Sequence, residues 1–414
     1  MGHGPHGTAA VAAGAGGRSH RGGPPPHPAG RPARLARAAL VCKPWCRVAS
    51  EPGFRRRYRE LHGAAPPHLL GVLCNLPAGA RFVPTSSFRP PRAASGGGGW
   101  RALDARHGRV LLANLYCKSG PIGDALVVWD PVTGRRLGLP ELPRHRETLQ
   151  WSSWNAAVLC AAAACDHLDC RRGPFLVALV GASGRKVFGH VYSSEAAGWS
   201  QPTSRFGDFD LDGSVRSPLV GNAVYFKCAK TMRSIGLPRF KILKYDLCTG
   251  QMSVIDTLIR GRCENLPLVL MTTEDNNGGL GFAVVHNSRL EMWARETDPN
   301  QGMGWAQSKD IELGTLLPAD ALSTPPELVG FAEGGVLFAR TVIGLFSIDV
   351  RSEQVRKIHG GSSILSVVPY MSFCFPVHLE LSLQARDQKV ALQVHEGLEA
   401  NCLSSVILLL VSLC

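Results

Sequence analysis

The chain from residue 67 to 380 alternates short apolar runs with polar turns. Runs such as RVLLANLY, ALVVWD, PFLVALVG and GVLFAR are rich in β-branched and aromatic residues, and clusters of Gly, Pro, Asn and Asp separate them. Short runs of this composition, bounded by turn residues, are typical of β-strands. The pattern predicts a mainly β domain over this whole region.

Three passages within the region share one order of elements. In each, a strand is followed by a second strand that ends at an aspartate, then by a polar turn and a third strand; the aspartates are Asp130, Asp246 and Asp349. An Asp followed by Thr-Gly suits a tight hairpin, because Gly134 and Gly250 can adopt backbone angles that other residues avoid. We interpret these aspartates as turn formers, and the passages as repeats.

The spacing of the repeats leaves room for further units. Two passages of another kind lie between them, and each runs through a loop to a tryptophan, Trp199 or Trp305. The marker aspartates are 116 and 103 residues apart, so two units of roughly 50 to 58 residues fit each interval, near the period of kelch-like propeller blades. This predicts a β-propeller of about six blades. A pair of β-sandwiches or a jelly roll would give a similar number of strands, but the repeated hairpin favours the propeller.

A different pattern precedes the β region. Residues 1–33 are rich in Gly, Pro, His and Ala, which bury too little apolar surface to offset the cost of ordering the backbone, so we predict disorder there. Over 34–66 apolar residues recur at helical spacings, Pro44 marks a bend, and Pro52 suits the first turn of a second helix. The apolar face of the first helix comprises Leu35, Ala39, Leu40, Cys42, Trp45, Cys46 and Val48. We therefore predict a helical unit over 34–66, a propeller over 67–380 and a tail over 381–414.

The positive charge of the chain is concentrated at its front. The whole sequence has a formal net charge of +13, and residues 1–66 contain eleven Arg and Lys against only Glu51 and Glu60. A basic segment can attract nucleic acid or an acidic protein surface. Nucleic-acid binding also uses aromatic side chains on which bases stack, and none are interleaved with these charges. We expect no nucleic-acid partner, and interpret Arg55, Arg56, Arg57 and Arg59 as a solvated helix face.

The cysteines and the termini indicate the compartment. Thirteen cysteines occur without a Cys-x-x-Cys pair, and most lie in apolar runs, which is typical of reduced, buried thiols. The N-terminal region has no apolar core of a secretory signal, and its Gly/Pro content argues against the amphipathic helix of a transit peptide. The apolar run at 403–414 is shorter than the roughly 20 residues of a membrane span. We expect a cytoplasmic or nuclear protein with no membrane partner.

Catalytic and metal-binding motifs are weak or missing in the sequence. The passage CAAAACDHLDC places Cys160, Cys165, Asp166, His167 and Cys170 close together, but the four-residue gaps between cysteines do not match the paired ligands of common zinc sites. We therefore interpret these cysteines as core or turn residues and expect no metal or cofactor. The sequence contains no Gly-x-Ser-x-Gly elbow, phosphate-binding loop or His-Glu-x-x-His motif, so no enzymatic activity is expected.

The helical segment and the β region together resemble a known family. The stretch LARAALVCKPWCRVASEPGFRRRYRELHGAAPPHLLGVL is similar to the second half of the F-box in plant F-box proteins, particularly the grass set with a propeller-like associated domain. The downstream phrases CAAAACDHLDCRRGPFLVALVG, LVGNAVYF, ILKYDL and PYMSF also look like that family. Matching F-box positions are Leu40, Val41, Cys42, Lys43, Trp45, Val48, Pro52, Phe54 and Leu61.

The resemblance implies a substrate receptor of an SCF-type (Skp-cullin-F-box) ubiquitin ligase. The helical unit would bind a Skp-type adaptor and, through it, a cullin, while the propeller would bind a target protein. The residues expected to contact the adaptor are Leu35, Leu40, Val41, Cys42, Trp45, Pro52 and Phe54. Trp45 is open to two interpretations, because an amphipathic aromatic can pack in the helical core or face the adaptor.

One departure from the family pattern gives a second hypothesis. The family's F-box begins with Leu-Pro and a helix of Leu and Ile that supplies much of the adaptor contact, whereas residues 20–34 here read HRGGPPPHPAGRPAR. The F-box therefore looks truncated at its N-terminal side. The alternative is a propeller interaction module that is uncoupled from the ligase.

Overall fold

The computed structural model describes the β region of the chain. The described residues are 68–86, 88–91, 99–114, 126–143, 151–163, 165, 167, 170–229, 240–257, 268–273, 278–286, 288–298 and 302–372. The segments predicted as disordered (1–33), as helices (34–66) and as a tail (381–414) lie outside these residues. Within the described part of the chain, no helix is long and apolar enough to cross a bilayer.

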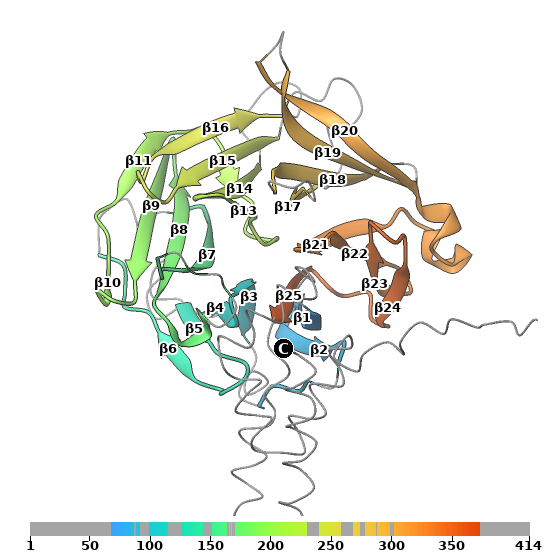
Figure 1. The fold of residues 1–414 in the computed structure, drawn as a ribbon, viewed down its shortest axis with the longest axis horizontal. Coiled ribbons are helices and arrows are strands. Elements are labelled where there is room, and N and C mark those ends of the chain that lie inside the picture. Colours follow the sequence, from blue (N-terminus) through green and yellow to red (C-terminus); the bar gives the residue numbers. More distant parts are fainter. Residues whose placement is uncertain are drawn as a thin grey trace, which may run out of the picture.

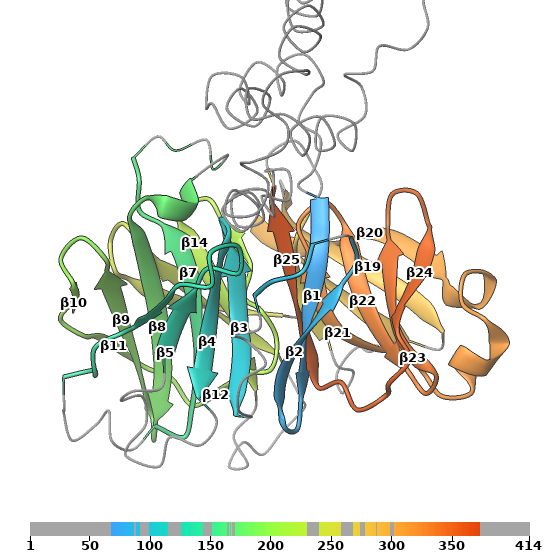
Figure 2. The ribbon, with the colours of Figure 1, turned by 90° about the horizontal axis from the view of Figure 1, so that it is seen from below.

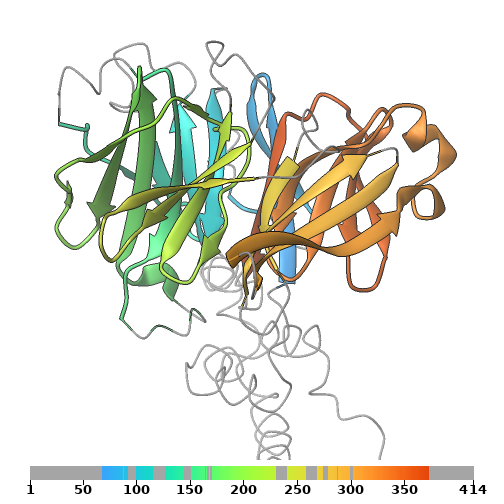
Figure 3. The same cartoon turned by 90° about the horizontal axis from the view of Figure 1, so that it is seen from above.

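Six antiparallel sheets are arranged around a central axis (Figure 1), so the mainly β, six-bladed propeller predicted from the repeats is confirmed. The strands nearest this axis run along it, as the two side views show (Figures 2 and 3). We number the sheets as blades one to six. Blade one contains β1 (His68–Leu76), β2 (Gly79–Pro84) and β25 (Ser366–Ser372). Blade two contains β3 (Trp100–Arg106), β4 (Arg109–Asn114), β5 (Leu126–Trp129) and β6 (Arg136–Gly138).

Blades three and four each have five strands. Blade three contains β7 (Ser153–Cys160), β8 (Phe175–Ser183), β9 (Lys186–Ser193), β10 (Gly198–Trp199) and β11 (Thr203–Phe206). Blade four contains β12 (Asp210–Leu211), β13 (Leu219–Val220), β14 (Ala223–Ala229), β15 (Lys241–Asp246) and β16 (Met252–Asp256). A short 3₁₀-helix, η4 (Cys170–Arg172), lies between β7 and β8.

Blades five and six have four strands each. Blade five contains β17 (Leu268–Thr272), β18 (Leu280–His286), β19 (Arg289–Asp298) and β20 (Gly302–Glu312). Blade six contains β21 (Glu327–Ala332), β22 (Val336–Thr341), β23 (Gly344–Asp349) and β24 (Val355–His359). The 3₁₀-helices η5 (Leu313–Thr315) and η6 (Ala319–Leu322) connect the two blades.

The three repeated passages and the two intervening ones form separate blades. The passages marked by Asp130, Asp246 and Asp349 are blades two, four and six, and Trp199 and Trp305 lie in blades three and five. Blade one has no counterpart among the predicted repeats, because its strands come from opposite ends of the β region. In it, β1 pairs with both β2 and β25, with Leu73 opposite Val368. This pairing closes the ring.

The core is divided among the interfaces between blades. Among the described residues, six clusters of buried apolar side chains occur, and each is shared by two neighbouring blades. Blades one and six, for example, share Val72, Val329, Phe338 and Val367. Both faces of each sheet are therefore covered by apolar side chains, which explains the nearly continuous apolar runs in the sequence.

A buried asparagine adds a polar link where the ring closes. Asn75 on β1 donates through Nδ2 to the carbonyl of Ala102 at 2.8 Å and to Ser366 Oγ at 2.9 Å, and its Oδ1 accepts from the Ala102 backbone N–H at 2.9 Å. All the polar atoms of this buried amide are thus satisfied, as burial requires. The side chain joins the two strands of blade one that meet at closure to the innermost strand of blade two.

Candidate functional site

The residues that the sequence assigned to adaptor binding lie outside the described part of the chain. They are Leu35, Leu40, Val41, Cys42, Trp45, Pro52 and Phe54. The docking surface therefore stays a prediction. The described residues define a different candidate site, at the centre of the ring.

Four charged side chains meet there, and we refer to them as the axial cluster: Asp104 and Arg106 on β3, Arg216 between β12 and β13, and Glu333 in the turn after β21. They come from blades two, four and six, which are not neighbours and so approach one another at the axis. Arg216 donates to Asp104 Oδ1 through Nε at 2.8 Å and to Glu333 Oε1 through Nη2 at 2.7 Å. Arg106 donates to the other oxygen of Asp104, and its Nε lies 3.8 Å from Glu333 Oε1.

An interruption of the innermost strand of blade four places Arg216 in this cluster. Both β12 and β13 pair with β14, and Arg216 lies in the connection between them. Asn155 on β7 holds this segment, because its Nδ2 donates to the carbonyl of Asp212 at 3.1 Å. The neighbouring blade thereby fixes the segment that carries the arginine.

The two guanidinium groups of the axial cluster are paired with two carboxylates. The Asp104 side chain is fully buried, and besides its two arginine partners it accepts a hydrogen bond from the Val158 backbone N–H at 2.9 Å. Glu333 keeps 44% of its side-chain surface exposed. Its partial removal from water raises its pKa, but Arg216 and Arg106 outweigh this effect and hold the pKa at about 2. At neutral pH Glu333 is therefore held as an anion beside two buried guanidinium groups.

This arrangement is poorly suited to acid-base catalysis. A general acid or base works best with a pKa near the working pH, whereas Glu333 has a pKa of about 2 and Asp104 is saturated with donors. His107 follows Arg106 in the turn between β3 and β4, and burial, with a smaller contribution from His167, lowers its pKa to about 3. The charged groups of the cluster connect blades two, four and six, and their geometry supports a structural role.

The marker aspartates form the turns that the sequence predicted. Each aspartate Oδ1 accepts from the backbone N–H groups two and three residues later, at distances between 2.9 and 3.3 Å. Gly134 and Gly250 follow with positive φ angles of 75° and 68°. In the third repeat, Glu353 adopts φ 55° where the other two have glycine. The prediction that these aspartates are turn formers is confirmed.

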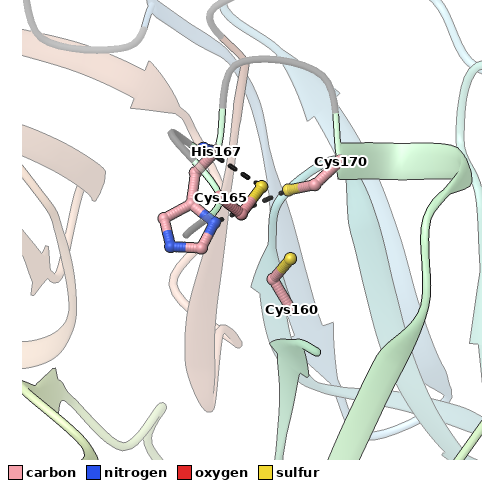
Figure 4. Close-up of side chains that lie close together, drawn as sticks. All are labelled: Cys160, Cys165, His167 and Cys170. Atoms are coloured by element: carbon pink, nitrogen blue, oxygen red, sulfur yellow. Dashed lines mark hydrogen bonds between the residues drawn. The ribbon is translucent and has the colours of Figure 1, made fainter. Parts of the chain in front are cut away.

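The structure also brings the potential ligand atoms of four residues together, three of which are cysteines that the sequence indicated as core or turn residues. Cys160, Cys165, His167 and Cys170 converge in the connection between β7 and β8 (Figure 4), and their ligand atoms all lie within 4.8 Å of one another. Asp166 lies outside the described residues. The gaps between the cysteines alone do not match a common zinc site. The pair in HLDC, with two residues between His167 and Cys170, was the signal that could have revealed the cluster.

Comparisons with known proteins identify no family. No family model and no curated protein matches the chain. Among solved structures, the "Dos1 propeller" is similar at 10% identity and a TM-score of 0.33 over 69% of this chain and 63% of that one. A functionally unknown protein from Desulfotomaculum acetoxidans is similar at 10% identity and a TM-score of 0.37, over 73% of this chain and 99% of that one. The WD40 domain of SCAP from fission yeast is similar at 12% identity and a TM-score of 0.32. The match covers 64% of this chain and 52% of that one, so this chain spans about half of its length. At these identities the likeness concerns the fold alone.

Proposed function

We propose that the protein is the substrate receptor of an SCF-type ubiquitin ligase. In this proposal the segment 34–66 binds a Skp-type adaptor, which recruits a cullin, and the propeller binds a target protein in the cytoplasm or nucleus. The support from sequence is the F-box-like stretch, in which Leu40, Val41, Cys42, Trp45 and Phe54 stand at matching positions. The support from structure is the strand of the ring to which that stretch is joined in the sequence.

The observation that carries the proposal is the point at which the ring begins. Strand β1 starts at His68, shortly after the predicted helical unit of residues 34–66, and pairs with β2 on one side and β25 on the other. Its side chains Val72 and Leu73 are buried in interfaces with the neighbouring blades. A docking segment joined to this strand is thus attached to a strand that is paired on both sides, and not to the edge of a sheet. Such attachment suits a receptor, because ubiquitin transfer depends on holding the target at a fixed position.

The receptor would act by proximity and would perform no bond chemistry itself. Tethering a target to the ligase raises the effective concentration of its lysines near the charged conjugating enzyme. A propeller suits this task because its loops form broad faces on a rigid scaffold. The pairing of Asp104 and Glu333 with Arg106 and Arg216 is consistent with a non-catalytic role, since neither carboxylate is poised for proton transfer.

The proposal is tested by measuring adaptor binding to the full-length chain. Purified protein and a purified Skp-type adaptor are mixed in an isothermal titration, and wild type is expected to bind. Trp45→Ala is expected to weaken binding at least tenfold, about 1.4 kcal/mol, because truncating an aromatic removes a large apolar contact. Phe206→Ala, at an exposed position on β11, is the matched control and should bind as wild type does.

Two outcomes would contradict the ligase proposal. One is that the wild-type chain, with a folded propeller, does not bind the adaptor. The other is that two separate variants, Trp45→Ala and a triple alanine variant at Leu40, Val41 and Phe54, both bind the adaptor as tightly as wild type does. The first outcome would favour the alternative, an interaction module uncoupled from the ligase. That alternative is supported by residues 20–34, which lack the Leu-Pro start of the family's F-box.

A further inference from the structure

The connection between β7 and β8 gathers four soft donor groups into one small volume. Cys160 is the last residue of β7, Cys170 is the first residue of η4, and Cys165 and His167 lie between them in the chain. Figure 4 shows the three sulfur atoms and the His167 ring directed toward a common centre. Their ligand atoms all lie within 4.8 Å of one another, and among the described residues this is the one such group of cysteine and histidine side chains.

The separations approach those of a tetrahedral metal site. With Zn–S bonds of about 2.3 Å and a Zn–N bond of about 2.0 Å, the edges of a tetrahedron are about 3.8 Å between two sulfurs and about 3.5 Å between sulfur and nitrogen. The observed distance between Cys170 Sγ and His167 Nδ1 is 3.7 Å. The wider pairs need to contract by no more than roughly 1 Å to reach the ideal edge. Side-chain rotation alone supplies a movement of that size.

Contacts outside the four residues hold their backbone in place. Arg109 on β4 donates through Nη2 to the carbonyl of Cys170 at 2.6 Å and also to the carbonyl of Gly173. The Ala161 backbone N–H donates to the carbonyl of Pro174 at 3.0 Å, which closes the base of the connection. Two ends of the ligand set are therefore anchored to neighbouring strands.

Features next to the ligand atoms are those expected around a bound metal. The His167 backbone N–H lies 3.4 Å from Cys165 Sγ, a contact that stabilises a thiolate. His167 has a φ of 57°, in the left-handed region that non-glycine residues seldom adopt, as has its neighbour His107 with a φ of 53°. The two imidazole rings pack with their centroids 4.2 Å apart. Three thiolates around a divalent cation leave one negative charge, and the Arg109 guanidinium lies beside it.

We propose that Cys160, Cys165, His167 and Cys170 bind one Zn²⁺ in a closed Cys₃His site. Thiolate and imidazole donors in a tetrahedral set favour zinc over oxygen-preferring cations such as Mg²⁺ or Ca²⁺. All four positions are filled by protein, so the site is structural and leaves no position for a substrate. On binding, the three thiols release their protons to solvent and the ring binds through Nδ1.

The proposed role of the ion is to fix one face of the ring beside the axial cluster. The His167 ring packs on His107, and His107 directly follows Arg106 of that cluster. Zinc would thus hold the connection of blade three against the turn between β3 and β4 of blade two. This site is independent of the proposed ligase function, because it requires neither an adaptor nor a target.

The first test is the metal content and spectrum of the full-length chain. The protein is purified under reducing conditions from zinc-supplemented cells, and inductively coupled plasma mass spectrometry is expected to find about one zinc per chain. Replacing zinc by Co²⁺ is expected to give intense visible bands of tetrahedral cobalt and a near-ultraviolet thiolate-to-cobalt band. Neither measurement depends on a variant folding. A wild-type chain with less than roughly a tenth of an equivalent of zinc after zinc supplementation, or an octahedral cobalt spectrum, would overturn the proposal.

The second test assigns the site to these residues. Cys170→Ser and His167→Gln are expected to lower the zinc content at least tenfold and abolish the tetrahedral cobalt bands, whereas Cys248→Ser, at an exposed cysteine of the turn after β15, should leave both unchanged. Retention of a full equivalent of zinc by both site variants would refute the assignment. An intact mass lower by two hydrogens in the metal-free wild type, with the bond mapped to two of these cysteines, would show a disulfide instead.

Discussion

Replacing Asp104 by asparagine tests whether the axial cluster stabilises the ring. The change removes one negative charge and keeps the size of the side chain. Asp104 is fully buried, and it is the shared partner of Arg106 and Arg216, whose side chains are each only 2% exposed. In the variant, two buried guanidinium groups keep Glu333 as their remaining carboxylate. Asp104→Asn is therefore expected to leave buried positive charge without sufficient compensation.

The magnitude follows from the burial of the pair. Removing one partner of a buried ion pair typically costs about 3 to 5 kcal/mol, because the remaining charge is left in a medium of low polarity. Part of this cost is offset here, since Glu333 still contacts both arginines. We expect a loss of roughly 3 kcal/mol, a large fraction of the about 5 to 15 kcal/mol by which folded domains are stable. For a domain of this size the melting temperature should fall by roughly 5 °C.

The assay is urea unfolding of the full-length chain, followed by tryptophan fluorescence, together with differential scanning calorimetry. The matched control is Asp310→Asn, which breaks an ion pair of 2.7 Å to Arg289 at the surface, where the side chains are 35% and 54% exposed. Surface pairs contribute about 0 to 1 kcal/mol, so this variant should unfold close to wild type. If Asp104→Asn loses no more stability than Asp310→Asn, the axial cluster does not stabilise the ring and our reasoning is wrong.

Three further changes test other parts of the structure. The carboxylate of Glu333 has a folded pKa of about 2, below its unfolded value, so its contribution to folding stability is present above the unfolded pKa and is lost as pH falls. The melting temperatures of wild type and Glu333→Gln should therefore differ at pH 6 and converge between about pH 4.5 and 2. A difference that stays constant over this pH range would contradict the prediction. Gly330→Ala places a Cβ 2.5 Å from a backbone carbonyl oxygen of β25, whereas the Cβ of Gly138→Ala meets nothing within 4 Å. Calorimetry should show that Gly330→Ala lowers the free energy of unfolding by roughly 1 to 3 kcal/mol and that Gly138→Ala does not. Equal stabilities of the two variants would refute the close approach. Tyr370→Ala removes a buried ring where the propeller closes and should cost about 3 to 5 kcal/mol in urea unfolding, while Phe206→Ala, at an exposed position, should cost little; similar losses would count against this packing.

The sequence was sufficient to predict the blades that are continuous in the chain. Each blade from two to six is built from consecutive strands, so the alternation of apolar runs and turn residues specifies it locally. The turns of Asp130, Asp246 and Asp349 were predictable for the same reason, because an aspartate caps its own turn within three residues. The adaptor-binding residues, including Trp45 and Phe54, stay a prediction from resemblance, because they lie outside the described part of the chain.

The candidate sites depended on contacts that local patterns do not encode. Arg216 reaches Asp104 and Glu333 because the innermost strand of blade four is interrupted, and no periodicity in the sequence marks that interruption. The cluster of Cys160 and Cys170 with Cys165 and His167 arises because a strand end and a 3₁₀-helix are brought face to face by the pairing of β7 with β8. The number of residues between these cysteines in the sequence therefore does not predict how close their sulfur atoms lie.

The amino-acid sequence by itself determined that the chain forms short strands with capped turns, repeated often enough for about six blades, since these properties depend on residues close together along the chain. Only the tertiary structure decided how the ring closes, which charges meet at its axis and which thiols gather at one face. Ring closure and the meeting of the axial charges require segments from different blades to approach, and their separation is set by the packing of whole sheets against one another. The thiols gather within a single connection, whose path is set by the pairing of β7 with β8. The pairing of β1 with β25 is the clearest case, because residues 68–76 and 366–372 come from opposite ends of the β region.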